Sequence, residues 1–153
     1  MNVSQSIETA LKNAMIAGGS SGAIAVADVF FNCFQDTDHE HDASFPQIEI
    51  IAAPDVPDGQ EVAKVSPLRR VVVGVYIYTQ TPDDKSHAVI VSLYDRVRSA
   101  LDDANKALDT WSTTYLPSGW YANCVLVQDS QEPYFDDDLQ AIALSVLVEV
   151  CVA

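Results

Sequence analysis

The stretch Arg69–Gln80, which reads RRVVVGVYIYTQ, decides the fold of this chain of 153 residues. Its side chains alternate with the period of two that is typical of a β-strand. One face carries the aliphatic residues Val71, Val73, Val75 and Ile77, and the other carries Val72, Gly74, Tyr76 and Tyr78. Both faces are apolar, so we expect something to cover each of them.

A helix is expected directly after this strand. The residues Pro82-Asp83-Asp84 predict a turn, and an amphipathic helix follows at about Ser86–Asp103. Its apolar stripe has three-and-four spacing and consists of Ile90, Leu93, Tyr94, Val97 and Leu101. We expect this stripe to cover one face of the sheet.

Further elements are predicted on either side. The apolar residues of Ser4–Ala17 share one helix face, and Gly18-Gly19 is a typical helix end. Gln47–Ala52 alternates polar and apolar residues, which predicts a strand. Two C-terminal strands are predicted, at Tyr121–Gln128 and at Ala141–Val152. The acidic loop Asp129–Asp138 lies between them.

Four segments lack a regular pattern. Gly22–Phe34 fits either a strand or a buried helix, and Trp111–Gly119 is a connector of undecided form. The polar stretches Asp36–Ser44 and Asp55–Lys64 are expected to be loops. The order of elements predicts an α+β fold in a single domain, residues 1–153, with a mainly antiparallel sheet packed against helices.

The charge of the chain narrows the classes of partner. Asp and Glu number 22 against 8 Lys and Arg, which gives a net charge of −14. Such a field repels phosphate groups, so specific binding of nucleic acid or of an anionic membrane is not expected. The charge still allows the protein to stand beside DNA.

The sequence shows neither a secretion signal nor a membrane span, and its cysteines do not suggest disulfide bonds. Met1–Gln5 carries neither the positive charge nor the apolar core of a secretion signal, and the longest apolar run, around Ala141–Val148, is too short for a membrane span. Cys33, Cys124 and Cys151 are odd in number and widely spaced. We expect them to be reduced, small and mostly buried residues in a protein made in the cytosol.

The sequence Gly18-Gly19-Ser20-Ser21-Gly22 formally matches the G-x-S-x-G motif of serine hydrolases. That motif needs a strand before the serine and a helix after it. Here a helix is predicted before it, and glycine beside serine is also typical of a flexible turn. We therefore interpret Ser20 as a turn residue.

The loop Asp36–Asp42, which reads DTDHEHD, is the best candidate for a metal site. It departs from the calcium-loop template, which has Gly where His41 stands and Glu where Gln47 stands. His39 and His41 lie two residues apart, which differs from the i, i+4 spacing of a zinc-binding helix. A solvated acidic loop explains the same residues, so we expect no specific metal here.

Other charged groups lack a chemical partner in the sequence. Asp136-Asp137-Asp138 fits an exposed turn better than half of a two-metal site, and Asp102-Asp103 is predicted at a helix end without a mechanism that needs it. His87 has no base or nucleophile paired with it. We therefore assign no catalytic residue, no metal ligand and no cofactor.

Arg69 and Arg70 stand out because cations are scarce in this chain. One interpretation is an interface role, in which they pair with acidic loops of a neighbouring subunit. The other is that they are gatekeeper charges beside an aggregation-prone strand. Both interpretations stay open at this stage.

The layout resembles the tail-terminator proteins of long-tailed bacteriophages, which are also called tail completion or head–tail joining proteins. The resemblance rests on the N-terminal helix, on the strand Phe45-Pro46-Gln47-Ile48-Glu49-Ile50, and on the strand Arg69–Gln80. It extends to the Thr/Pro/Asp turn, the helix Ser86–Asp103 and the C-terminal hairpin that closes at Val152. It is a likeness of pattern over most of the chain.

The resemblance implies a structural virion protein at the phage neck, made in the host cytoplasm. It implies a homo-oligomeric ring, most simply a hexamer, that caps the tail tube, ends its polymerisation and docks to the connector. The tube protein and the connector would be its partners, and DNA would pass through the lumen. Two features of the residues agree with this role. The strongly negative net charge suits a channel through which DNA slides, and the sheet has two apolar faces but too few predicted helices to cover both.

Three alternatives remain at the level of sequence. The first is another neck or tail-tube protein of the same class. The second is a metal-dependent or hydrolytic enzyme that uses the loop Asp36–Asp42. The third is a bacterial acidic adaptor domain.

Overall fold

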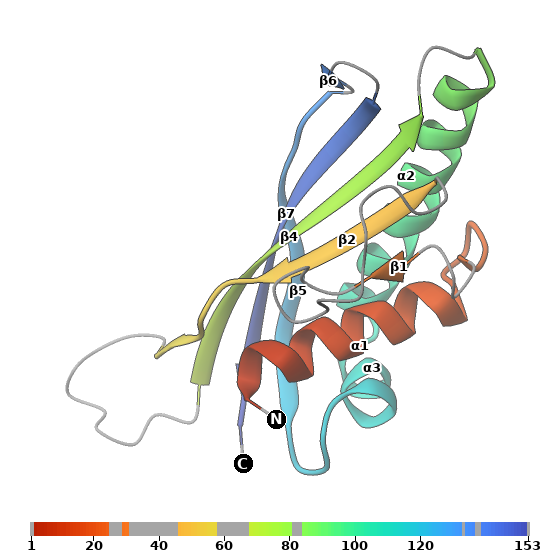
Figure 1. Cartoon of the computed structure of the whole chain (residues 1–153). Helices are drawn as coiled ribbons and strands as arrows, with labels where there is room; N and C mark the ends of the chain where they lie inside the picture. Colours follow the sequence, from red (N-terminus) through yellow and green to blue (C-terminus); the bar gives the residue numbers. More distant parts are fainter. Residues whose placement is uncertain are drawn as a thin grey trace.

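The structure, a computed structural model, describes residues 2–24, 29–30, 46–57, 68–80, 84–132, 134–136 and 139–152. Within these ranges the chain forms three helices and one sheet (Figure 1). The elements in chain order are α1 (Val3–Ala17), β1 (Val29–Phe30), β2 (Gln47–Ala52), β3 (Val56–Pro57), β4 (Leu68–Gln80), α2 (Asp84–Lys106), α3 (Leu108–Tyr115), β5 (Tyr121–Ser130), β6 (Tyr134–Asp136) and β7 (Leu139–Cys151).

The strands lie in the order β1-β2-β4-β7-β5, while β3 also pairs with β4 and β6 also pairs with β7. Every pair is antiparallel except β1 with β2, which is parallel. Long antiparallel strands with helices between them confirm the predicted α+β class.

Strands β4 and β7 form the centre of the sheet. They pair over their whole length, from Leu68 opposite Cys151 to Gln80 opposite Leu139. In this register the aliphatic residues of the two strands fall on the same face, as Val73 opposite Val146 illustrates. The core therefore forms along one face of the sheet, where alternate residues of both strands are fully buried.

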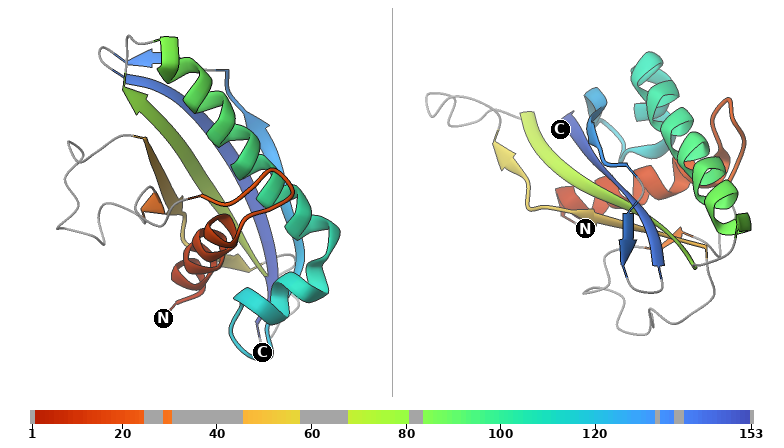
Figure 2. Two further views of the ribbon diagram at one scale, coloured as in Figure 1. Left: turned by 90° about the vertical axis from the view of Figure 1, so that its right-hand side faces the viewer. Right: turned by 90° about the horizontal axis from the view of Figure 1, so that it is seen from above.

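All three helices pack on that same face (Figure 2). The stripe of α1 contributes Ile7, Leu11 and Met15, and that of α2 contributes Ile90, Leu93, Val97 and Leu101. Helix α1 begins at a capping box between Asn2 and Gln5 and ends at Gly18, whose φ of 90° suits glycine. The predicted cover by the stripe of α2 is confirmed, but the helices reach only one of the two faces.

Several segment assignments change. Helix α2 continues to Lys106, so Asp102 and Asp103 do not end it. The undecided segment Trp111–Gly119 contains most of α3. The predicted loop Asp55–Lys64 includes β3, which pairs with β4.

Similar changes affect two other segments. The predicted acidic loop Asp129–Asp138 includes the end of β5 and all of β6. The end of β5 and the whole of β6 form strands because both pair with the backbone of the long strand β7. Within Gly22–Phe34, the residues Val29–Phe30 form a strand beside β2, and most of the remainder lies outside the described residues.

Candidate functional site: the open face of the sheet

The face of the sheet that points away from the helices, here called the open face, is the most distinctive surface of the described chain. By strand register it comprises Gln47, Glu49, Ile51, Ala53, Leu68, Arg70, Val72, Gly74, Tyr76, Tyr78, Tyr121, Cys124, Leu126, Asp129, Ala141, Ala143, Ser145, Leu147, Glu149 and Cys151. Of these residues, Gln47, Glu49, Ala141 and Leu147 are buried. No helix in the described part of the chain packs on it (Figure 2). It contains the second apolar face that the sequence predicted for β4, the face of Val72, Gly74, Tyr76 and Tyr78. The described helices do not cover this face.

An apolar ridge crosses the open face. Val72 of β4 lies opposite Leu147 of β7, and Leu147 lies opposite Leu126 of β5. Val72 is 43% exposed and Leu126 is 47% exposed, which is high for large aliphatic side chains within a sheet. Tyr121 is a further exposed residue of this face, at the start of β5.

A hollow of about 410 Å³ lies beside the ridge. Its floor includes Gly74, which lies between Ile51 and Ser145 on the neighbouring strands. The missing side chain matters, because a Cβ atom at Gly74 would stand 2.7 Å from the aromatic ring of Tyr76. That ring in turn stacks on Tyr78 at 6.3 Å between centroids. Asp129 is the charged residue among those that line the hollow.

Both arginines singled out in the sequence have carboxylate partners within the chain. Arg70, on the open face, donates to Glu149 of β7 at 3.2 Å. Arg69 lies 3.8 Å from Asp55. These pairs are partly exposed and are each worth at most about 1 kcal/mol. Arg70 and Glu149 therefore place a neutral pair at the border of the apolar ridge.

The edges of the sheet are capped by helix side chains. At the β5 edge, the N–H of Ala122 donates to the hydroxyl of Ser112 at 2.9 Å, and the N–H of Val125 donates to the amide oxygen of Asn105 at 3.1 Å. At the end of β2, the N–H of Ala52 donates to Glu8 at 2.9 Å. These side chains occupy three edge N–H groups that could otherwise donate to another strand.

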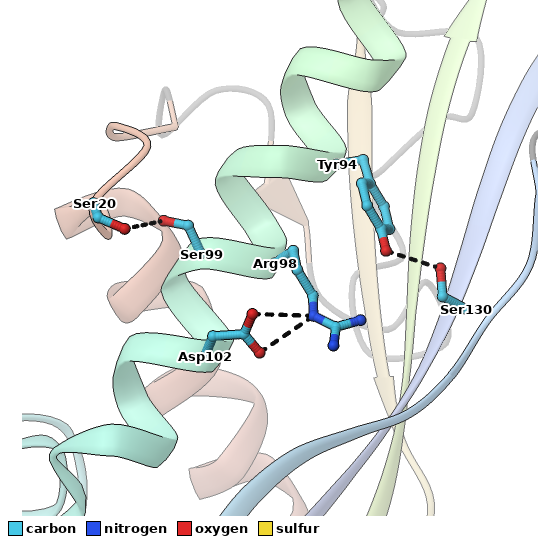
Figure 3. Close-up of polar contacts among 6 residues, drawn as sticks. All are labelled: Ser20, Tyr94, Arg98, Ser99, Asp102 and Ser130. Carbon is cyan, nitrogen blue, oxygen red and sulfur yellow. Dashed lines mark hydrogen bonds and ion pairs between the residues drawn. The ribbon is translucent and has the colours of Figure 1, made fainter.

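The loop Gly18–Gly22 is attached to α2 instead of forming a nucleophile elbow. Helix α1 precedes Ser20, where the elbow requires a strand. The Ser20 hydroxyl donates to the Ser99 hydroxyl over 3.5 Å (Figure 3), and the N–H of Ser21 also donates to Ser99 at 2.9 Å. The serines thus serve contacts between this loop and α2.

The acidic pair in α2 has structural partners. Asp103 accepts a 2.8 Å hydrogen bond from the N–H of Ser20, which fixes the loop against the helix. Asp102 accepts from Arg98 at 3.2 Å, one turn earlier (Figure 3). On the other side of α2, Tyr94 and Ser130 are linked at 3.2 Å between their hydroxyl oxygens, which ties the helix to the end of β5.

Several predicted candidates lie outside the described residues. These are Cys33, the loop Asp36–Asp42 with its two histidines, and Asp137–Asp138; for Asp136 and His87 the backbone alone is described. Within the described ranges, no group of three or more His, Cys, Asp or Glu side chains stands close enough to hold a metal. Cys124 and Cys151 are half-buried cysteines that form no disulfide bond, and the thiol of Cys124 donates to the carbonyl oxygen of Leu147 at 4.0 Å.

No helix among the described residues has the length and apolar character required to cross a membrane. The chain matches no protein-family model, and a search of curated proteins finds no relative.

Proposed function

We propose that this protein is a structural subunit of a bacteriophage virion that forms a homo-oligomeric ring at the head–tail junction. The observation that carries the proposal is the open face, an apolar sheet surface on a chain whose described helices all pack on the opposite side. In a lone subunit, Val72, Tyr121 and Leu126 of this face are exposed to water. In a closed ring, one interface repeated by rotation covers it in every copy.

The net charge of −14 supports a position around the path of the genome. An acidic lumen repels the phosphate backbone, so DNA passes through without adhering to the wall. The same charge opposes ring closure, because every subunit repels its neighbours. Apolar contact must therefore supply the association, and the open face offers it.

The arrangement of elements also supports the resemblance to tail-terminator proteins. The N-terminal helix, the two central strands, the amphipathic helix and the C-terminal hairpin occur as α1, β2, β4, α2 and the β5–β7 pair. We accordingly propose a six-membered ring that caps the tail tube, ends its polymerisation and docks to the neck or connector. This role requires neither a catalytic residue nor a cofactor.

Assembly on tail tubes tests this proposal. Purified protein would be added to tubes polymerising from the tube protein of the same phage, and tube ends and lengths would be measured by electron microscopy. We expect a ring at the tube end and a halt in growth. A protein of similar size and charge from an unrelated source is the control.

Two outcomes would contradict the proposal. Unchanged growth with bare tube ends would remove the capping role. Incorporation along the whole tube would instead favour the alternative within the same class, a tail-tube protein.

A further inference from the structure

Helices α1, α2 and α3 meet around a hollow of about 190 Å³. Its small lining residues come from the end of α1, from α2 and from the residue before α3, and they are Ala14, Gly18, Gly19, Ala100, Ala104 and Ala107. Side chains of one carbon or none leave space at this junction. The hollow is separate from the open face, because the helices pack on the other side of the sheet (Figure 2).

Helical spacing places the lining residues together. Ala100 and Ala104 stand one turn apart on α2, and Trp111 and Tyr115 stand one turn apart on α3. The rings of Trp111 and Tyr115 lie 6.1 Å apart between centroids, with 49° between their planes. Gly19 allows the chain after α1 to approach α2 closely, because a Cβ atom there would stand 2.7 Å from the backbone nitrogen of Ala100. The hollow thus combines aromatic and small apolar walls.

The indole N–H of Trp111 is a buried donor without an acceptor in the described part of the chain. Trp111 is 4% exposed, and its Nε1 atom has no hydrogen-bond partner among the described residues. Buried polar side-chain atoms nearly always have a partner, because an unpaired one bears the full cost of its desolvation. Trp111 also lines the hollow. A ligand in the hollow that carries an acceptor would satisfy this donor.

Asp103 limits the charge of such a ligand. Its carboxylate lines the hollow and accepts a hydrogen bond from the N–H of Ser20 at 2.8 Å. A carboxylate has about four lone-pair sites, so Asp103 can also accept from a hydroxyl group of a ligand. Its negative charge, together with the net charge of −14, disfavours a carboxylate or a phosphate in the hollow. A neutral oxygen is therefore the acceptor that suits Trp111.

We propose that this hollow binds a small, neutral aromatic molecule that bears one hydroxyl group. Its oxygen accepts from the indole N–H of Trp111, its hydroxyl hydrogen donates to Asp103, and its ring lies against the apolar walls. The volume of about 190 Å³ suits a single ring, since an engineered apolar cavity of about 150 Å³ binds benzene. This site is independent of the proposed ring, so either can be wrong without the other.

Titration of the ¹⁵N-labelled protein with p-cresol and with toluene tests the site by nuclear magnetic resonance. The two probes share a ring and a methyl group, and p-cresol adds a hydroxyl group. The chain has two tryptophans, so Trp120, which lies outside the lining of the hollow, gives an internal control signal. We expect p-cresol to shift the indole N–H signal of Trp111 and not that of Trp120. It should bind on the order of tenfold more tightly than toluene, because it pairs the buried donor.

Three variants locate the binding, with the backbone amide signal of Ala104 as the common readout. Trp111→Phe keeps an aromatic ring but removes the donor, so it should abolish the preference for p-cresol over toluene. Ala107→Leu adds bulk at an exposed lining position and should block both probes. Thr113→Leu adds the same side chain at an exposed position of α3 outside the lining and should bind like the wild type. Thermal unfolding of each variant verifies that it is folded.

Three outcomes would overturn the site. Equal affinity of the wild type for p-cresol and toluene would show that the donor of Trp111 plays no part. Binding that leaves the Trp111 signal unchanged, or that survives Ala107→Leu, would lie elsewhere. N-acetyltyrosine amide carries the same phenol on a peptide unit, and tighter binding of this probe than of p-cresol would assign the hollow to a side chain of a protein partner instead of a free molecule.

Discussion

The carboxylate of Glu8 in α1 accepts a 2.9 Å hydrogen bond from the backbone N–H of Ala52 at the end of β2. Glu8 is only 2% exposed. One turn earlier, the hydroxyl of Ser4 donates to the carbonyl oxygen of Ala53 at 2.6 Å. Burial raises the pKa of Glu8, and the N–H of Ala52 lowers it by less. The helix is thus joined to the sheet edge by a carboxyl group whose pKa is raised because burial disfavours its charged form.

Replacement of Glu8 by Gln should remove a pH dependence. Because the pKa of Glu8 is raised in the folded state, the group favours folding below its ordinary pKa, and this contribution is lost as the pH rises through the folded value. Glu8→Gln keeps an acceptor for Ala52 and cannot ionise. It should match the wild type near pH 4 and be at least as stable at pH 7, as urea unfolding measures.

Glu8→Ala is the control for this measurement. It leaves the N–H of Ala52 without its acceptor and should cost about 1–3 kcal/mol of unfolding free energy. If Glu8→Gln loses more stability at pH 7 than at pH 4, the charged form of Glu8 is the favoured one and our account of this edge is wrong.

Ser112→Ala should destabilise the fold at the β5 edge of the sheet. Ser112 is buried and accepts from the N–H of Ala122, so the variant leaves a buried donor unpaired. We expect a loss of about 1–3 kcal/mol in chemical denaturation. Thr113→Ala removes an exposed hydroxyl from the next position and should change stability by less than about 0.5 kcal/mol. Equal effects of the two variants would contradict the edge cap.

Gly19→Ala should separate the loop Gly18–Gly22 from α2. A Cβ atom at Gly19 would stand 2.7 Å from the backbone nitrogen of Ala100, which cannot move without distorting the helix. The cost should be about 1–3 kcal/mol in thermal or urea unfolding.

Ser20→Ala should be nearly silent, because the exposed hydroxyl of Ser20 makes one long contact with Ser99. A serine-reactive fluorophosphonate should not label the wild-type protein at this residue. Labelling of Ser20 would show an activated nucleophile and would favour the hydrolytic alternative.

The long elements of this fold could be predicted because their signals are local. Strand β4 is an apolar run rich in valine and tyrosine, which favour strands, and the apolar stripes of α1 and α2 show helical spacing. Helix α3 was undecided because eight residues make a helix that depends on packing, here of the buried Trp111, more than on its own pattern. Strands β3 and β6 are two and three residues long and exist through pairing with β4 and β7.

The candidate site could be predicted only in part. The sequence indicates that β4 has two apolar faces, but the choice of one common face by all three helices arises from tertiary packing. The caps are equally non-local, since Glu8 and Ala52 are 44 residues apart. The partners of Arg69 and Arg70 could not be predicted either, because Asp55 and Glu149 approach them only through β3 and β7.

The acidic loop Asp36–Asp42 should bind no stoichiometric metal. Its histidines lack the spacing of a zinc helix, and its carboxylates depart from the calcium-loop template. Titration calorimetry with Zn²⁺ and with Ca²⁺ should show only weak binding of no fixed ratio. One tight ion per chain that is lost in His39→Ala would contradict this prediction and favour the enzyme alternative.

A homo-oligomeric ring held by apolar contact against charge repulsion should change its degree of assembly with salt concentration, and the mass of the assembly measures this change. Light scattering or native mass spectrometry would compare about 0.1 M and about 1 M salt, between which the screening length falls from roughly 10 Å to roughly 3 Å. With a net charge of −14 per subunit, association should tighten as salt rises, towards a six-membered species. A protein that stays monomeric at both salt concentrations and with tube ends present would contradict the account.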